Sequence, residues 1–185
     1  MLVNDAGQGQ YGTFDTTDIE RELAIIQLNI GACVVFTKLY LREMLARDEG
    51  KILLVGSIAG ELPGPLQAVY HGTKAFVNSF AESIQEENKD RNVTITALLP
   101  GLTDTDFFDK ADMTRAKNVV EKSGMAEPAD VAKDGYQALM NGENRVISGL
   151  MNKVQVSASN VIPNELVAAN VHSQSKPVDG DESAK

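Results

Sequence analysis

Tyr70 and Lys74 are the residues whose types and spacing most directly predict chemistry. They lie four positions apart in the run Tyr70-His71-Gly72-Thr73-Lys74, about one helical turn. On a helix both side chains project from one face, with Cβ atoms roughly 5–6 Å apart. An ammonium about 4 Å from a phenol favours the phenolate by about 4 kcal/mol, enough to bring a pKa of about 10 near 7. The pair therefore predicts a tyrosine that exchanges a proton with a substrate.

Ser57 lies thirteen residues before Tyr70 and supplies a hydroxyl for the same chemistry. It would hydrogen-bond the substrate oxygen and hold it against the phenol. Each of these residues also has a simpler interpretation. A Tyr-x-x-x-Lys spacing occurs on solvated helices, where the lysine only covers the ring, and Ser57 could cap the turn that follows it. The surrounding elements have to decide between these interpretations.

Short apolar strands alternate with amphipathic helices along the chain. Strands are expected at 2–3, 52–55, 93–99 and 145–148, and helices at about 17–47, 67–89 and 128–141. This order predicts a Rossmann-like, doubly wound α/β fold, a parallel sheet with helices on both faces. Residues 1–150 are expected to form this domain, 151–172 a C-terminal helical extension, and 173–185 a disordered tail.

Three segments are expected to meet at the carboxyl ends of the strands of this sheet. Residues 4–7, Ser57 and Pro100-Gly101 each follow a different strand. Ligands in open parallel sheets bind beyond the carboxyl ends of the strands. Because Tyr70 and Lys74 lie at the start of the helix that follows Ser57, we expect them at the same end of the sheet.

Composition and net charge limit the classes of function that this chain can have. The chain has 185 residues, 43% hydrophobic and 23% charged, which suits one soluble domain. A net charge of −9 opposes binding to nucleic acid or to an anionic membrane surface. Apolar stretches such as 32–36 are far shorter than the ~20 residues that span a bilayer, so a cytoplasmic protein is expected. Cys33 is the only cysteine, and the two histidines are far apart in sequence, so we expect no disulfide within the chain and no metal site.

The pattern as a whole resembles the short-chain dehydrogenase/reductase family. The matching segments are Val3-Asn4-Asp5-Ala6-Gly7 (the family's Asn-Asn-Ala-Gly element), Asn29 (its active-site asparagine at a helix kink), Gly56-Ser57 (its substrate-orienting serine), Tyr70 to Lys74 (its Tyr-x-x-x-Lys), and Pro100-Gly101 with Thr103 and Thr105 (its loop beside the nicotinamide). They occur in the family's order and cover roughly residues 1–150.

The resemblance implies an NAD- or NADP-dependent oxidoreductase that interconverts an alcohol and a carbonyl compound. Tyr70 would be the general acid/base. Lys74 would lower its pKa and hold the nicotinamide ribose, while Ser57 orients the substrate. Asn29 would anchor a water that links the lysine to solvent, or it would only form a local kink.

The same resemblance implies the cofactor contacts. Asn4, Ala6 and Gly7 would lie near the adenosine side of the cofactor. The loop with Pro100, Gly101, Thr103 and Thr105 would surround the carboxamide, and Tyr70 and Lys74 would border the nicotinamide. The two threonines have an alternative role, which is to satisfy loop backbone groups.

The sequence departs from the family at its beginning. Asp5 stands where the family has a second asparagine, and the family's glycine-rich pyrophosphate turn has no counterpart. The residue that would choose between NAD and NADP is missing too. We therefore expect an N-terminally truncated domain with segment 2–4 as an exposed edge and with weaker cofactor binding.

Two further hypotheses remain open at this point. The chain could be a catalytically silent scaffold that associates with a partner, or it could use the Tyr-Lys pair for epimerisation. The resemblance also implies a homo-oligomer that pairs the two long helices around Asn29 and Tyr70. For the enzyme, the expected partner is a small alcohol or carbonyl substrate.

Overall fold

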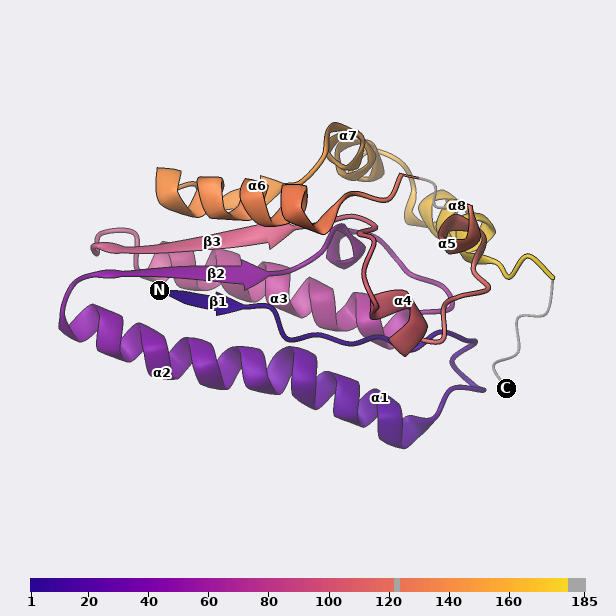
Figure 1. Cartoon of the computed structure of the whole chain (residues 1–185), viewed down its shortest axis with the longest axis horizontal. Helices are drawn as coiled ribbons and strands as arrows, with labels where there is room; N and C mark the ends of the chain where they lie inside the picture. Colours follow the sequence, from indigo (N-terminus) through magenta and orange to yellow (C-terminus); the bar gives the residue numbers. More distant parts are fainter. Residues whose placement is uncertain (122–123, 180–185) are drawn as a thin grey trace.

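A four-stranded parallel sheet forms the centre of the computed structural model, which describes residues 1–121 and 124–179 (Figure 1). Its strands are β1 (Leu2–Asn4), β2 (Gly50–Val55), β3 (Val93–Leu99) and β4 (Arg145–Ile147), in the order β1-β2-β3-β4. Leu2 pairs with Ile52, and Ala97 pairs with Arg145. The predicted strands and the predicted doubly wound α/β fold are confirmed.

Helices cover both faces of the sheet (Figure 1). One face carries α1 (Ile19–Ile26), η1 (Gln27–Ala32), α2 (Cys33–Ala46) and α3 (Ala68–Glu87), and the other carries α6 (Pro128–Asn141). Successive residues of a strand point to opposite faces. Ile52 and Leu54 therefore pack with the core on the α2 and α3 side, while Leu53 packs against α6. Burial on both faces explains why this strand is continuously apolar.

The segment from 19 to 46 is one continuous helix with a π-helical turn, η1, in its middle. It is long and apolar enough to cross a membrane by length and composition, and 22% of its most apolar window is buried. A core helix of a soluble protein passes the same test, so these properties do not assign it to a membrane. In this fold the helix packs along the sheet (Figure 1). Asn29 of η1 is hydrogen-bonded to Gln8, in the segment that follows β1.

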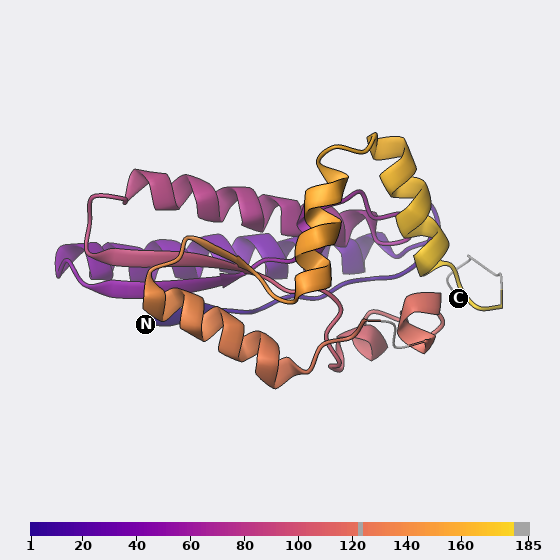
Figure 2. The ribbon, with the colours of Figure 1, turned by 90° about the horizontal axis from the view of Figure 1, so that it is seen from above.

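The C-terminal residues form two helices at the carboxyl end of the sheet (Figure 2). These are α7 (Leu150–Ser159) and α8 (Asn164–Ser175). Residues 173–179, expected to belong to a disordered tail, have defined contacts in this structure. The Tyr11 hydroxyl donates to the Ser175 carbonyl at 2.5 Å, and Pro177 forms an antiparallel bridge with Ala116. Residues 180–185 lie outside the described residues.

Candidate active site

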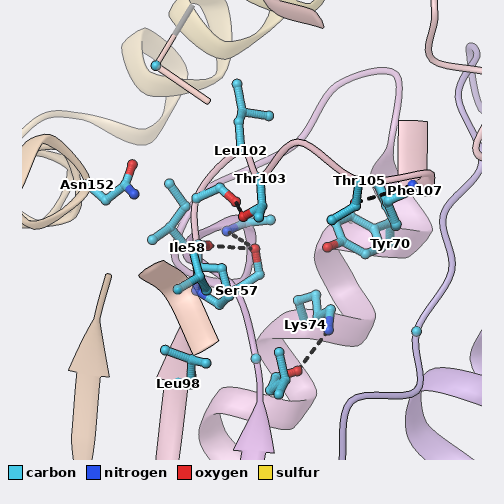
Figure 3. A pocket seen from close by; sticks show the side chains of 18 of the residues that line it. Ser57, Ile58, Tyr70, Lys74, Leu98, Leu102, Thr103, Thr105, Phe107 and Asn152 are labelled. Carbon is cyan, nitrogen blue, oxygen red and sulfur yellow. Dashed lines mark hydrogen bonds between the residues drawn. The ribbon is translucent and has the colours of Figure 1, made fainter. Parts of the chain in front are cut away.

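A cavity of about 970 Å³ extends from the carboxyl ends of β2 and β3 along the side of the sheet that α6 covers, where Leu53 and Leu139 line it. It contains most of the residues singled out from the sequence (Figure 3). Those that line it are Gly7, Ser57, Tyr70, Lys74, Pro100, Gly101, Thr103 and Thr105. Asn4, Ala6 and Asn29 are not among the lining residues. The structure thus brings the predicted proton-transfer groups and the Pro-Gly loop together.

Tyr70 and Lys74 occupy the first turns of α3, as the spacing predicts. The Lys74 side chain is buried, with 6% of its surface exposed, and its Nζ donates to the Val55 carbonyl at 2.9 Å. The same Nζ lies 5.9 Å from the centroid of the Tyr70 ring. Figure 3 shows the Tyr70 hydroxyl pointing into the cavity with the Lys74 ammonium below it. The Lys74 ammonium therefore lies on the buried side of the Tyr70 ring.

Burial controls the protonation of both residues. It raises the pKa of Tyr70 to about 12, which the Ser57 hydroxyl partly offsets and the charge of Asp5 reinforces. It lowers the pKa of Lys74 to about 8, against the opposing charge of Asp5. The expectation that Lys74 brings the phenol near neutrality is therefore wrong for this structure, because burial disfavours both charged forms. At neutral pH the phenol therefore keeps its proton.

Ser57 both caps a turn and faces the phenol. Its Oγ accepts from the Ala59 amide at 3.0 Å, at the start of the short 3-10 helix η2 (Ile58–Glu61), and donates to the Pro100 carbonyl at 3.4 Å. The capping interpretation is correct for this hydroxyl. The same hydroxyl also interacts with the Tyr70 phenol. Capping therefore fixes the group that would orient a substrate.

Asn78 is a positioning residue that the sequence interpretation missed. Its Nδ2 donates to the Ser57 carbonyl at 3.0 Å and to Glu61 Oε1 at 2.7 Å, and its Oδ1 accepts from the Ser57 amide at 3.4 Å. A Cβ at Gly60 would lie 2.6 Å from this Nδ2, so only glycine permits the approach. The spacing of Tyr70, Lys74 and Asn78 at every fourth position is the signal that could have found it.

Asn29 connects the segment after β1 to helix α3. Its Nδ2 donates to the Gln8 carbonyl at 2.9 Å and to Thr73 Oγ1 at 2.8 Å, while its Oδ1 accepts from the Gln8 amide at 2.9 Å. The predicted kink is present as the π-helical turn η1, a feature frequent at functional sites. Its role in proton transfer stays a prediction.

Asn4 and Ala6 do not line the cavity. Asn4 Nδ2 donates to the Cys33 carbonyl at 3.2 Å and to Thr37 Oγ1 at 3.4 Å, so this side chain holds β1 against α2. Ala6 is exposed. Gly7 alone of these three residues lines the cavity, where an added Cβ would lie 3.4 Å from Lys74 Nζ.

The two threonines of the Pro-Gly loop use their hydroxyls on the loop itself. Thr103 Oγ1 donates to the Gly101 carbonyl at 3.1 Å, and Thr105 Oγ1 accepts from the Phe107 amide at 3.3 Å. These bonds match the alternative role given above. Asn152 of α7 was also missed by the sequence interpretation; it packs against Gly101, where an added Cβ would lie 2.4 Å from its Nδ2.

The cavity fits the nicotinamide end of a dinucleotide. An ammonium carries three donors, and Lys74 uses one of them on Val55, so others can meet ribose hydroxyls. The Oδ1 atom of Asn118, which also lines the cavity, is buried and has no hydrogen-bond partner among the described residues. Those residues contain no group of three or more His, Cys, Asp or Glu side chains that could hold a metal ion.

The sequence profile of the family described as "short chain dehydrogenase" matches residues 1–116. The chain belongs to this family. Among solved structures, this chain is similar to a 7beta-hydroxysteroid dehydrogenase, with a TM-score of 0.78 and 22% identity over 92% of this chain and 66% of that one. It is also similar to a short-chain dehydrogenase from Sphingobium yanoikuyae in complex with NADPH, with a TM-score of 0.74 and 21% identity over 88% of this chain and 65% of that one. At these identities the structural likeness shows the fold.

Two curated relatives illustrate the sequence similarity. The chain is 31% identical to 3-dehydrosphinganine reductase of Danio rerio over 72% of its own length and 41% of that protein. It is 31% identical to the NADP-dependent 3-hydroxy acid dehydrogenase of Schizosaccharomyces pombe over 80% of its length and 59% of that protein. The chain therefore spans about half the length of these curated relatives.

Proposed function

We propose that this chain carries the proton-transfer end of an NAD- or NADP-dependent oxidoreductase that interconverts an alcohol and a carbonyl compound. The observation that supports the proposal most is the shared cavity of the Tyr70 phenol and the Ser57 hydroxyl, with Lys74 beneath them. The names of similar proteins agree, since one is an NADP-dependent dehydrogenase and one was solved with NADPH.

The nicotinamide cofactor, when bound, supplies or accepts the hydride. Tyr70 gives its proton to the carbonyl oxygen during reduction and takes it back from the hydroxyl during oxidation. Its raised pKa keeps the phenol protonated at neutral pH, which is the form that donates a proton during reduction. Ser57 donates a hydrogen bond to the same oxygen and fixes its distance from the phenol.

Lys74 acts behind the phenol. Its ammonium is held by the Val55 carbonyl 2.9 Å away and lies close to Gly7, where the chain leaves β1. In this position it stabilises negative charge that develops on Tyr70 as the proton leaves. Its remaining donors are available for ribose hydroxyls.

A scaffold that associates with a partner is the competing proposal. The observation that favours it is the set of exposed apolar side chains on the α1 to α2 helix, which includes Ile19, Leu23, Val35, Phe36, Leu39 and Tyr40. The same surface supports the expected homo-oligomer, so the two proposals share a feature. A cytoplasmic location stays a prediction.

Titration calorimetry with NADPH and NADH, combined with a carbonyl-reduction assay, tests the proposed function. We expect one nucleotide to bind at micromolar to millimolar concentration and a simple ketone to be reduced in its presence. Absence of binding for both nucleotides at millimolar concentration would exclude the enzyme for this chain and favour the scaffold. Binding without reduction of any ketone would contradict the assignment of Tyr70 and Ser57.

A further inference from the structure

Glu61 is a largely buried carboxylate that binds the side chain of Asn78. The Glu61 side chain is 19% exposed, and its Oε1 accepts from Asn78 Nδ2 at 2.7 Å. Among the described residues, neither Glu61 nor Asn78 lines the cavity that contains Ser57. The backbone of Ser57 is therefore held by groups that lie outside the candidate site.

The carboxylate favours one orientation of the Asn78 amide. The oxygen of this amide accepts from the Ser57 amide at 3.4 Å, and its nitrogen donates to the Ser57 carbonyl at 3.0 Å. In the flipped orientation, the Asn78 oxygen would face two acceptors, the Ser57 carbonyl and Glu61 Oε1. A hydrogen bond to an ionised carboxylate is about twice as strong as a neutral one. Glu61 therefore adds the strongest bond to the orientation that satisfies both backbone groups of Ser57.

Glycines on both sides of Ser57 leave room for this amide. A Cβ at Gly56 would lie 2.1 Å from Asn78 Oδ1, and a Cβ at Gly60 would lie 2.6 Å from Asn78 Nδ2. A side chain at either position would displace Asn78. The chain on both sides of Ser57 thus admits Asn78 at hydrogen-bond distance, and Glu61 follows directly after the second glycine.

Arg145 of β4 holds the other oxygen of the same carboxylate. Its Nη2 lies 3.1 Å from Glu61 Oε2, and its Nη1 lies 2.9 Å from Glu82 Oε1. A carboxylate that is largely removed from water is costly unless it is paired. Without Arg145, the Glu61 carboxylate would regain hydration by turning toward solvent, away from Asn78. The guanidinium therefore keeps the carboxylate in contact with the amide.

We propose that Glu61 and Arg145 are positioning residues for Ser57, and that Arg145 acts through Glu61. The contacts run from Arg145 to Glu61, then to Asn78 and the backbone of Ser57, whose hydroxyl interacts with the Tyr70 phenol. The consequence for turnover rests on the proposed function, because a misplaced catalytic group slows the reaction. The consequence for the Ser57 backbone does not depend on that function.

Amide hydrogen exchange of the full chain, measured by NMR, tests the positioning directly. The Ser57 amide donates to Asn78, and the Ala59 amide donates to Ser57 Oγ at 3.0 Å, so both amides report on the serine. In Glu61→Ala and in Arg145→Met we expect both to exchange about tenfold faster, the effect of losing one charge-assisted hydrogen bond. The amides of Ile52 and Leu54, inside the sheet, report on global unfolding and should change much less.

Glu82→Gln is the matched control. It removes the second ion pair of Arg145, at a side chain that is 54% exposed, and leaves the pair between Arg145 and Glu61 in place. Exchange at Ser57 and Ala59 should stay within about twofold of wild type, as for other exposed ion pairs. The double variant Glu61→Ala/Arg145→Met should exchange no faster than Glu61→Ala alone, because Arg145 acts through Glu61.

Two further measurements complete the test. Circular dichroism shows whether each variant folds, and Glu61→Gln, which keeps the volume and removes the charge, should shift the same two amides if Glu61→Ala does not fold. In a ketone-reduction assay, kcat should fall roughly three- to tenfold in Glu61→Ala and in Arg145→Met, while the dissociation constant of the nucleotide stays unchanged. A role confined to stability would not produce this difference between the two constants.

Each outcome decides the proposal. Unchanged exchange at Ser57 and Ala59, equal acceleration of the sheet amides, or an unchanged kcat in an active enzyme would overturn the positioning role. Faster exchange in the double variant than in Glu61→Ala would refute the action of Arg145 through Glu61. If the two amides respond as expected and the wild type reduces no ketone, the positioning of Ser57 stands and the proposed catalysis is what fails.

Discussion

The side chain of Asn78 forms hydrogen bonds with both the backbone amide and the backbone carbonyl of Ser57. The amide nitrogen of Asn78 donates to the Ser57 carbonyl at 3.0 Å, and its oxygen accepts from the Ser57 amide at 3.4 Å. Helix α3 therefore carries Tyr70 and Lys74 and also fixes the serine that follows β2. One rigid helix sets the distances among all three groups, which is the geometry that proton transfer requires.

Replacing Asn78 by alanine should impair both stability and turnover. Two hydrogen bonds to Ser57 and one to Glu61 would be lost, and the Ser57 backbone groups would be left unpaired. We expect the free energy of unfolding to fall by about 1–3 kcal/mol and kcat to fall more than KM rises. Chemical denaturation and steady-state kinetics measure the two effects. Ser79→Ala, at the exposed next position of α3, is the control, and equal losses in both variants would refute the positioning role.

Removing the Tyr70 hydroxyl should abolish catalysis while leaving the fold intact. General acid/base groups contribute typically 10²–10⁴-fold, so Tyr70→Phe should lose about that factor in kcat. Its thermal unfolding and its affinity for the nucleotide should change little. Tyr40→Phe, on an exposed face of α2, should keep full activity in the same assay. Residual turnover above a tenth of wild type in Tyr70→Phe would assign the proton to another group.

Lys74→Met should stabilise the protein at neutral pH. Burial lowers the pKa of Lys74 to about 8 from 10.5, so the folded state pays for a buried ammonium that the unfolded state keeps hydrated. That shift corresponds to about 3 kcal/mol as an upper limit. Between pH 8 and 10.5 the unfolded wild type binds more protons than the folded one, so wild-type stability rises with pH there. The advantage of the variant is therefore full below pH 8 and is lost toward pH 10.5.

Urea denaturation of wild type and Lys74→Met at several pH values measures this difference. Lys38→Met, on the exposed side of α2, should show no comparable gain at pH 7. A Lys74→Met variant less stable than wild type at pH 7 would mean that the hydrogen bond to the Val55 carbonyl outweighs the cost of burial.

The exposed apolar side of α2 should mediate self-association. Phe36 is 48% exposed and Leu39 is 54% exposed, and they lie among other apolar side chains of the same helix. Sedimentation velocity should show a dimer or larger species for the wild type, and Phe36→Glu should shift it toward the monomer. Val161→Glu, at a position that is 82% exposed and lies outside α2, should leave the assembly unchanged. A monomeric wild type at micromolar concentration would contradict this expectation.

The sequence was informative where a local pattern decides the structure. The strand predicted at 93–99 is β3 with the same bounds, because a continuous β-branched and apolar run ends at Pro100. The meeting of Ser57, Tyr70 and the Pro-Gly loop followed from the parallel order of the strands. The contacts of residues 173–179 could not be predicted from the sequence, because they are made with residues 115–117 and no local signal reveals that pairing.

The direction in which the pKa of Tyr70 shifts could not be predicted from the spacing of Tyr70 and Lys74. A distance of one helical turn predicts attraction between Tyr70 and Lys74, but it does not include the burial of either group. Burial depends on β2, the loop after β1 and the Phe107 segment, and it outweighs the pairwise attraction.

The π-helical turn at residues 27–32 divides the long helix into two segments with different rotational phase. An α-helix turns by about 100° per residue, so one extra residue in a turn rotates everything after it by about that angle. Asn29 can thus face Gln8 and Thr73 while Cys33 and Thr37 face Asn4. Deleting a single residue from this turn would restore a regular helix, and either the asparagine or the β1 contact would then point away from its partners. The number of residues in this turn therefore determines both whether α2 can bind Asn4 of β1 and whether Asn29 can bind Gln8 and Thr73 beside the site.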